Sequence, residues 1–356
     1  MFPTTSLDFL KRLLDTPGPS GFEGAPARVW RDGVAQFATV ATDVSGNSLA
    51  TVAGTGPGPT LMLAGHIDEI GLIVTYIDDA GLVYVSTIGG WDTQVLVGQR
   101  IRFSGANGDV VGVVGKKPIH LMRPDERDKV SKVADLWVDI GAATREEAAA
   151  LLTIGDPGVI DARMLELPNG RIVSRSIDNR IGAFVVAEAL RRYAERPGAA
   201  TVVGVATTQE EIGFHGGGAL VAASRVNPAM AIAVDVTFAS DPPGVEKKEH
   251  GDHRIGGGPV LARGSVVSPV VFSLLQDAAR ALEMPYTIHA VGRDTATDAD
   301  FIHLAREGVA TGLVSIPNRY MHSPNEMVSL DDVERAATLI ADVCRRVTDA
   351  TDFTAR

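Results

Sequence analysis

From about residue 170 to the end of the chain, short apolar segments alternate with amphipathic segments of helical period. Neighbouring parallel strands need a crossover connection, which is usually a helix. The alternation therefore predicts a three-layer α/β/α domain with a largely parallel sheet. The expected strands are 201–207, 229–235, 286–290 and 309–316, and the expected helices are 180–194, 216–224, 268–283, 297–306 and 329–347.

The first part of the chain supplies one more strand of this sheet and then changes character. Residues 60–65 form a continuous apolar run, as expected of a strand buried on both faces. Residues 72–165 are instead rich in short β-type segments separated by glycine, with one helical pattern near 144–152. We therefore expect a small β-barrel or sandwich inserted into the α/β domain, with the chain divided into residues 1–71, 72–165 and 166–356.

Polar side chains gather where the expected buried strands end. His66 and Asp68 follow the first strand, and Glu210 and Glu211 follow strand 201–207. In open α/β sheets, ligands bind beyond the carboxyl ends of the strands. The remaining candidates are Asp178 before helix 180–194, Asp235 at the end of strand 229–235, and His322 a few residues after strand 309–316.

Imidazole and carboxylate groups together suit Zn²⁺, Mn²⁺ or Co²⁺ better than Ca²⁺ or Mg²⁺, which prefer oxygen ligands. The candidates are too many for one tetrahedral zinc ion. They fit two ions that share a carboxylate, as in dinuclear hydrolases. Adjacent side chains on an extended segment point apart, so one member of the Glu210–Glu211 pair could bind metal while the other faces water.

Each candidate also has an ordinary structural interpretation. His66 and His322 could be packing or loop histidines, Glu210 and Glu211 a solvated pair, Asp235 a turn residue, and Asp178 the N-cap of its helix. All of these interpretations would have to hold together for the metal site to be absent. The other histidines that we considered are expected to be surface or packing residues: His215, His250, His253 and His303.

Composition excludes several classes of protein. A formal net charge of −11 repels phosphate backbones, so we expect no nucleic-acid partner. The sequence contains no run of eighteen apolar residues, so we expect no membrane span. The N-terminal segment lacks the pattern of a secretory signal, and the single cysteine, Cys344, cannot form an internal disulfide. Both features favour a cytoplasmic protein.

The residues also identify a family. The chain resembles the M42 metallo-aminopeptidases, which include glutamyl and leucyl aminopeptidases and form large tetrahedral shells. The resemblance covers nearly the whole chain, and its motifs are specific in combination. They are PGPSGFEG (17–24), AGHIDEIG (64–71), SRSIDNRIGA (174–183), TTQEEIGFHGG (207–217), AVDVTFASDPPG (233–244) and the segment 296–334, which contains YMHSPNE.

The resemblance implies a role for each candidate. His66 and Asp235 would bind one metal ion, Glu211 and His322 the other, and Asp178 would bridge the two. Glu210 would be the general base that activates a metal-bridging water, and Asp68 would orient the imidazole of His66. The resemblance further implies a catalytic domain of the zinc-peptidase type and a cis peptide bond between Asp178 and Asn179.

The expected function is therefore that of a dinuclear aminopeptidase. It would bind two divalent ions, with Zn²⁺ favoured over Co²⁺ or Mn²⁺, release N-terminal residues from short peptides, and assemble into a large homo-oligomer through residues 72–165. Two alternatives remain open: a deacylase or carboxypeptidase of the related M20 group, and a catalytically silent assembly protein. In M20 enzymes the extra domain lies between the last two ligands, whereas here the longest gap lies between His66 and Asp178.

Overall fold

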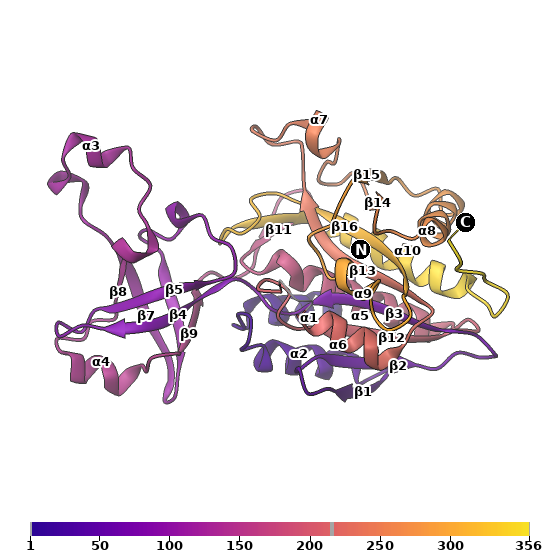
Figure 1. Cartoon of the computed structure of the whole chain (residues 1–356), viewed down its shortest axis with the longest axis horizontal. Helices are drawn as coiled ribbons and strands as arrows, with labels where there is room; N and C mark the ends of the chain where they lie inside the picture. The colour runs from indigo at the N-terminus through magenta and orange to yellow at the C-terminus, as the bar shows by residue number, and fades with distance from the viewer. Residues whose placement is uncertain (1, 214–216, 356) are drawn as a thin grey trace.

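The computed structural model describes residues 2–213 and 217–355. It consists of a large α/β body and a smaller β-barrel that projects from one side of it (Figure 1). The chain enters the barrel after its third strand and returns to the α/β body afterwards, so both ends of the chain lie in the larger body.

An eight-stranded sheet forms the centre of the α/β body. Its order is β1-β2-β12-β3-β13-β16-β14-β15. The central strands β12, β3, β13 and β16 are parallel and almost wholly buried, whereas β2 pairs antiparallel with β12, and β14 antiparallel with β16. The strands are β1 (Thr39–Thr42), β2 (Ser48–Val52), β3 (Thr60–His66), β12 (Thr201–Thr207), β13 (Met230–Phe238), β14 (Val260–Gly264), β15 (Thr287–Val291) and β16 (Ala310–Asn318).

Helices cover both faces of this sheet and complete the three layers (Figure 1). The central helix α5 packs against β3, β12 and β13, and is buried on almost every side because α1, α2 and α10 pack around it. Helices α6 and α9 lie on the other face. The helices are α1 (Thr4–Asp15), α2 (Gly24–Val34), α5 (Ile177–Glu195), α6 (Gly217–Val226), α7 (Lys247–His250), α8 (Pro269–Ala281), α9 (Ala299–Ile302) and α10 (Leu330–Arg346).

The inserted body is a closed barrel of order β4-β5-β8-β7-β6-β9. It has an apolar core of its own, which includes Leu72, Phe103 and Val138. Helix α4 (Arg145–Leu151) packs on β4, and the short helix α3 (Pro124–Arg127) lies at the tip of an arm that extends from the barrel. The strands are β4 (Gly71–Ile77), β5 (Val83–Ile88), β6 (Arg100–Gly105), β7 (Gly108–Gly115), β8 (Trp137–Asp139) and β9 (Pro157–Ile160).

A separate three-stranded sheet has the order β10-β11-β17. Its strands are β10 (Leu165–Leu167), β11 (Arg171–Ser174) and β17 (Glu326–Ser329). Its antiparallel register places Ser174 opposite Glu326. This pairing brings the segment before α5 next to the segment that follows β16, although about 150 residues separate them in the sequence.

The structure confirms the predicted fold class and corrects some details. The sheet is mixed rather than largely parallel, because hairpin β1–β2 adds one antiparallel edge and β14 inserts antiparallel beside β16. The expected helix 297–306 is shorter: α9 ends at Ile302, and the chain continues in tight turns. No helix in the described ranges has the length and apolar character needed to cross a bilayer.

Candidate metal centre

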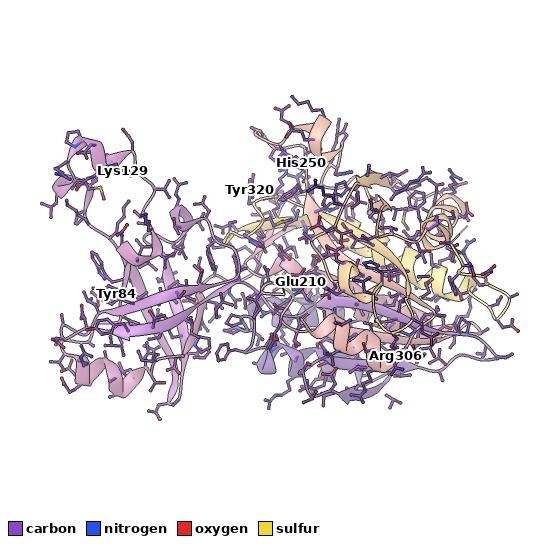
Figure 2. All side chains as sticks on the ribbon, in the orientation of Figure 1. Tyr84, Lys129, Glu210, His250, Arg306 and Tyr320 are labelled. Atoms are coloured by element: carbon purple, nitrogen blue, oxygen red, sulfur yellow. The ribbon has the colours of Figure 1, made fainter. Side chains whose placement is uncertain are left out.

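The candidate side chains meet where the parallel strands end. His66 is the last residue of β3 and pairs with Thr207, the last residue of β12. Asp235 lies in the adjacent strand β13, and Glu210 follows the end of β12. In Figure 2, Glu210 lies on the side of the α/β body that faces the barrel, whereas Arg306 lies away from it.

His66 is buried and faces three carboxylates. Its Nε2 atom lies 3.3 Å from Oδ1 of Asp178, 3.6 Å from Oε2 of Glu210 and 3.9 Å from Oδ1 of Asp235. The Asp178 carboxylate therefore does not cap α5, and the peptide bond that follows Asp178 is cis.

His322 approaches the same aspartate from the other side. It lies in the loop between β16 and β17, and its Nε2 atom is 3.4 Å from Oδ2 of Asp178 and 3.3 Å from Oε2 of Glu211. The second oxygen of Glu211, Oε1, is buried and has no hydrogen-bond partner in the part of the chain that the structure describes. A buried carboxylate oxygen of this kind is costly unless a cation or water satisfies it.

Acceptors fix both imidazoles through their other ring nitrogen. Nδ1 of His66 lies 3.3 Å from a carboxylate oxygen of Asp68, and Nδ1 of His322 lies 2.8 Å from the carbonyl oxygen of Gly90, in the barrel. Because a carbonyl can only accept, Nδ1 of His322 must carry the hydrogen. Nε2 of each ring is therefore the atom left to bind a metal.

The donor set fits divalent cations. Within residues 2–213 and 217–355, the side chains able to hold a metal jointly form two overlapping groups: His66 with Glu210 and Asp235, and His66 with Asp178 and Glu211. The first group includes Glu210, to which the family resemblance gives the role of a base, and neither group includes His322. Four carboxylates around two imidazoles give a site whose negative charge favours metal ions.

These contacts raise the pKa of both histidines. Burial lowers the pKa of His66, but the Glu210 charge and the hydrogen bonds to Asp178 and Asp68 outweigh it and raise the pKa well above its ordinary value. Burial also opposes protonation of His322, yet hydrogen bonds to Asp178 and Glu211 raise its pKa to about 11.

Burial and the neighbouring charges also shift the pKa values of the carboxylates. Burial and the nearby negative charges raise the pKa of Glu210 and of Asp235 well above their ordinary values, and burial with the Asp178 charge raises that of Glu211 to about 7. Burial works against ionisation of Asp178, but its two histidine neighbours lower its pKa. Without a cation the centre therefore holds protons, which a cation can displace.

Asp68 connects His66 to the segment that carries the glutamates. Its carboxylate accepts hydrogen bonds from the backbone N–H groups of Glu210 and Glu211, at 3.2 and 3.1 Å, and from Oγ of Ser20 at 2.6 Å. Asp68 is fully buried. It thus holds the ring of His66 and the backbone of both glutamates at once.

Sequence reasoning missed the buried ion pairs beneath the centre. Glu69 pairs with Arg175 and Arg180, and the guanidinium of Arg180 also donates to the backbone carbonyls of Ile67 and Leu13. The segments SRSIDNR and HIDE carried the signal, since charged residues there flank the candidate ligands. These bonds hold the loop after β3 against α1 and the start of α5.

A cavity of about 890 Å³ opens from the centre. Its walls away from the metal ligands include Phe238, Val291, Phe301, Leu313 and Met321. The lining also includes polar and charged residues such as Arg293, Asp294 and Asp300. A cavity of mixed character that reaches a cluster of carboxylates can receive a side chain beside the reacting group.

The four histidines that were expected to be surface or packing residues differ in position. His253 is buried, and its Nδ1 atom lies 2.8 Å from Oγ1 of Thr287, as expected of a packing residue. His250 is not only a surface residue, because it lines the large cavity. His303 lies 3.0 Å from the carbonyl oxygen of Ala299 through Nδ1, and His215 lies outside the described residues.

The chain is similar to known aminopeptidases over most of its length. A model of the M42 glutamyl aminopeptidase family matches residues 46–339. The lysyl aminopeptidase of Pyrococcus furiosus is 35% identical over 340 residues, which cover 93% of this chain and 94% of that protein.

Solved structures agree over almost the whole length. The TET aminopeptidase of a marine sediment archaeon of the Thaumarchaeota has a TM-score of 0.91 at 34% identity, with 97% of each chain covered. The TET1 peptidase of Pyrococcus horikoshii, described as able to assemble into a tetrahedron or a large octahedral shell, has a TM-score of 0.83 at 29% identity. That match covers 96% of this chain and 100% of the other.

Proposed function

The chain belongs to the M42 glutamyl aminopeptidase family and is a peptide hydrolase, and from this premise we propose that it is a dinuclear metal-dependent aminopeptidase that acts on short peptides. The observation that carries the proposal is the position of Asp178, whose two carboxylate oxygens face two different histidines at 3.3 and 3.4 Å. A carboxylate placed in this way is suited to bridge two cations.

The ligands divide around that aspartate. His66 and Asp235 would hold one cation, and His322 and Glu211 the other, with Asp178 shared. The Oε1 atom of Glu211, which has no hydrogen-bond partner among residues 2–213 and 217–355, supports this division, since a cation would satisfy it. Zn²⁺ suits the mixture of imidazole and carboxylate, and Co²⁺ or Mn²⁺ can occupy the same donors.

Bound divalent cations would lower the pKa of water and polarise the scissile carbonyl group. Glu210 would take the proton from the attacking water and deliver it to the leaving amine. Its raised pKa suits that exchange, because a base that must also act as an acid works best with a pKa near the operating pH. Its side chain is 16% exposed, so it can reach solvent in the cavity.

The acidic surroundings favour peptides with a free N-terminus. A substrate α-amine can bind a cation or pair with a carboxylate of the centre, while a blocked N-terminus offers neither interaction. The cavity next to the centre would receive the first side chain. The M20 alternative loses its support, because the family model matches residues 46–339 and the barrel lies between His66 and Asp178.

We also infer that the chain assembles with copies of itself into a large shell, as the TET1 peptidase is described to do. The barrel supports this inference, since its arm exposes the apolar residues Ile119, Leu121 and Val130. The single cysteine, Cys344, is buried and free, which is consistent with a reducing compartment such as the cytoplasm.

The proposal is tested by hydrolysis of aminoacyl anilides. The purified protein with added Zn²⁺, Co²⁺ or Mn²⁺ should release the anilide, and removal of metal by a chelator should abolish the activity. N-acetylated versions of the same substrates should not be cleaved. Glu210→Gln should bind as much metal as the wild type but lose about 10²- to 10⁴-fold in kcat, the usual range for a lost general base.

The matched control for Glu210→Gln is Glu307→Gln, at an exposed position on the turn after α9. It removes the same charge without touching the centre, so its kcat should equal that of the wild type. Unchanged turnover in Glu210→Gln would remove the assignment of the base. Cleavage of the acetylated substrates would remove the aminopeptidase assignment.

A further inference from the structure

One buried carboxylate contacts both segments that meet at the shared aspartate. Glu326 is the first residue of β17 and is only 2% exposed. Its Oε1 atom accepts a hydrogen bond from the backbone N–H of His322 at 2.8 Å, and its Oε2 atom accepts one from the backbone N–H of Asp178 at 2.9 Å. Neither carboxyl oxygen of Glu326 has a role in the metal binding or proton transfer proposed above.

The strand pairing explains how one side chain reaches two distant segments. Glu326 lies opposite Ser174 in the antiparallel pair of β17 with β11. Asp178 follows Ser174, the last residue of β11, by four positions in the sequence. His322, in the loop before β17, precedes Glu326 by four positions. The side chain of Glu326 therefore occupies the gap between these two backbones.

The backbone of His322 needs such support because its conformation is unusual. His322 has a φ angle of +58°, a left-handed value that costs free energy for a residue with a Cβ atom. The hydrogen bond from its N–H to Oε1 of Glu326 fixes the backbone at that residue. The bond thus holds the loop in the conformation that directs Nε2 of His322 toward Asp178.

We infer that Glu326 is a positioning residue of the metal centre, which fixes the spacing between the shared ligand Asp178 and the ligand His322 by binding both of their backbone N–H groups. The inference rests on the proposed dinuclear function. Glu326 does not touch the ions or the substrate. It acts through the two ligands whose imidazole and carboxylate atoms lie 3.4 Å apart.

The test compares Glu326→Gln with a matched variant. Glutamine has the same shape but one acceptor oxygen, and its amide NH₂ would face the second backbone N–H, so one of the two bonds is lost. Asp332→Asn is the control, because Asp332 is also fully buried and accepts two backbone N–H groups, from Gly256 and Gly258, outside the centre. Each metal-free protein is titrated calorimetrically with Zn²⁺, and its thermal unfolding is followed by circular dichroism.

We expect both variants to lose thermal stability but only Glu326→Gln to lose metal affinity. The loss should fall on the weaker of the two binding steps and amount to about 10- to 100-fold, as is common for residues that orient metal ligands. Equal affinities in Glu326→Gln and wild type would overturn the inference and leave the proposed function intact. If wild type itself binds fewer than two ions per chain, the dinuclear proposal fails instead.

A second variant covers the case in which Glu326→Gln fails to fold. If Glu326→Gln does not fold, Glu326→Asp replaces it, since aspartate keeps the carboxyl group but is too short to reach both N–H groups. A reduced affinity in folded Glu326→Asp supports the inference. Failure of both variants to fold, with Asp332→Asn folded, would assign Glu326 to the stability of the fold and overturn the positioning role.

Discussion

The two histidines of the centre face one aspartate from opposite sides, and each has its Nδ1 atom against an acceptor. This arrangement leaves the two Nε2 atoms directed at the same carboxylate. Such a pair of rings has no role in the apolar core, because burial of two imidazoles among carboxylates is costly unless protons or cations balance the charge. The geometry therefore suits an ion-binding centre better than a packing cluster.

The pKa values predict how metal affinity changes with pH. In the metal-free centre the pKa of His322 is raised to about 11 and that of Glu211 to about 7, so both hold protons at and below neutral pH. A cation must displace these protons, and low pH therefore opposes binding. We expect the affinity for Zn²⁺ to rise between about pH 6 and pH 8, by about tenfold per pH unit for each proton displaced.

Competition with a chromogenic chelator at several pH values measures this dependence. Calorimetry in buffers of different ionisation enthalpy gives the number of protons released. An affinity that does not change over this pH range would show that the ligands are already deprotonated and would contradict the charge distribution described here.

The sequence predicted the candidate ligands and Asp68, but not the other groups that hold them. His66, Glu211 and Asp235 could be found because they are polar residues at the ends of apolar strands. Glu326 could not, since both of its bonds are to backbone N–H groups and its position depends on the pairing of β17 with β11. Contacts of this kind leave no spacing pattern in a single sequence.

At the scale of elements, a turn of the barrel takes part in the centre. Gly89 and Gly90 follow β5, and the carbonyl oxygen of Gly90 accepts the hydrogen bond from Nδ1 of His322. The indole N–H of Trp91 donates to the carbonyl oxygens of Gly71 and Ile88, which fixes the turn against the base of the barrel. The insertion thus orients a candidate ligand of the α/β body.

Gly89→Ala tests this connection. Gly89 has a φ angle of +75°, and a Cβ atom there would lie 2.7 Å from Cγ2 of Ile70 and 3.6 Å from Cβ of Glu211. The substitution should displace the turn and weaken both metal binding and kcat/KM. The loss of unfolding free energy should be about 1–2 kcal/mol from the backbone strain alone.

Gly98→Ala is its control, because Gly98 has a φ angle of +80° but, in the described part of the chain, no atom beyond its own neighbours in sequence lies within 4 Å of the added Cβ. It carries the same backbone strain without the contact with the centre. Metal affinity and kcat/KM should match those of the wild type in this control. Identical behaviour of the two variants would show that the turn does not orient His322.

The elements themselves were predicted with uneven success. The pattern of α10 and of the central strands was clear, since helix 329–347 and strand 201–207 each have the period of their class. Strand β14 was missed, because five residues at the edge of the central group, two of them exposed, give little alternation. Helix α9 was predicted too long, since the amphipathic pattern continues through turns that are not helical.

At the scale of the whole molecule, the projecting barrel exposes apolar residues that a monomer would leave in water. Ile119, Leu121 and Val130 are 60%, 68% and 56% exposed, and they lie on the arm whose tip is marked by Lys129 in Figure 2. We therefore expect light scattering to give a mass many times that of one chain. Leu121→Asp should lower that mass, because it would bury a charge in the contact.

Leu304→Asp serves as the control, since Leu304 is 66% exposed but lies on the α/β body next to α9. Its mass should remain that of the wild-type assembly. A wild-type protein that is monomeric would contradict the role proposed for the barrel. That residues 72–165 form a domain for assembly stays a prediction, which this measurement tests.

The central claim is that two cations share the carboxylate of Asp178, and anomalous diffraction from crystals grown with Zn²⁺ tests it most directly. The account predicts two peaks per chain, one beside His66 and Asp235 and the other beside His322 and Glu211, with Asp178 in contact with both. A single peak, or peaks away from these side chains, would contradict it.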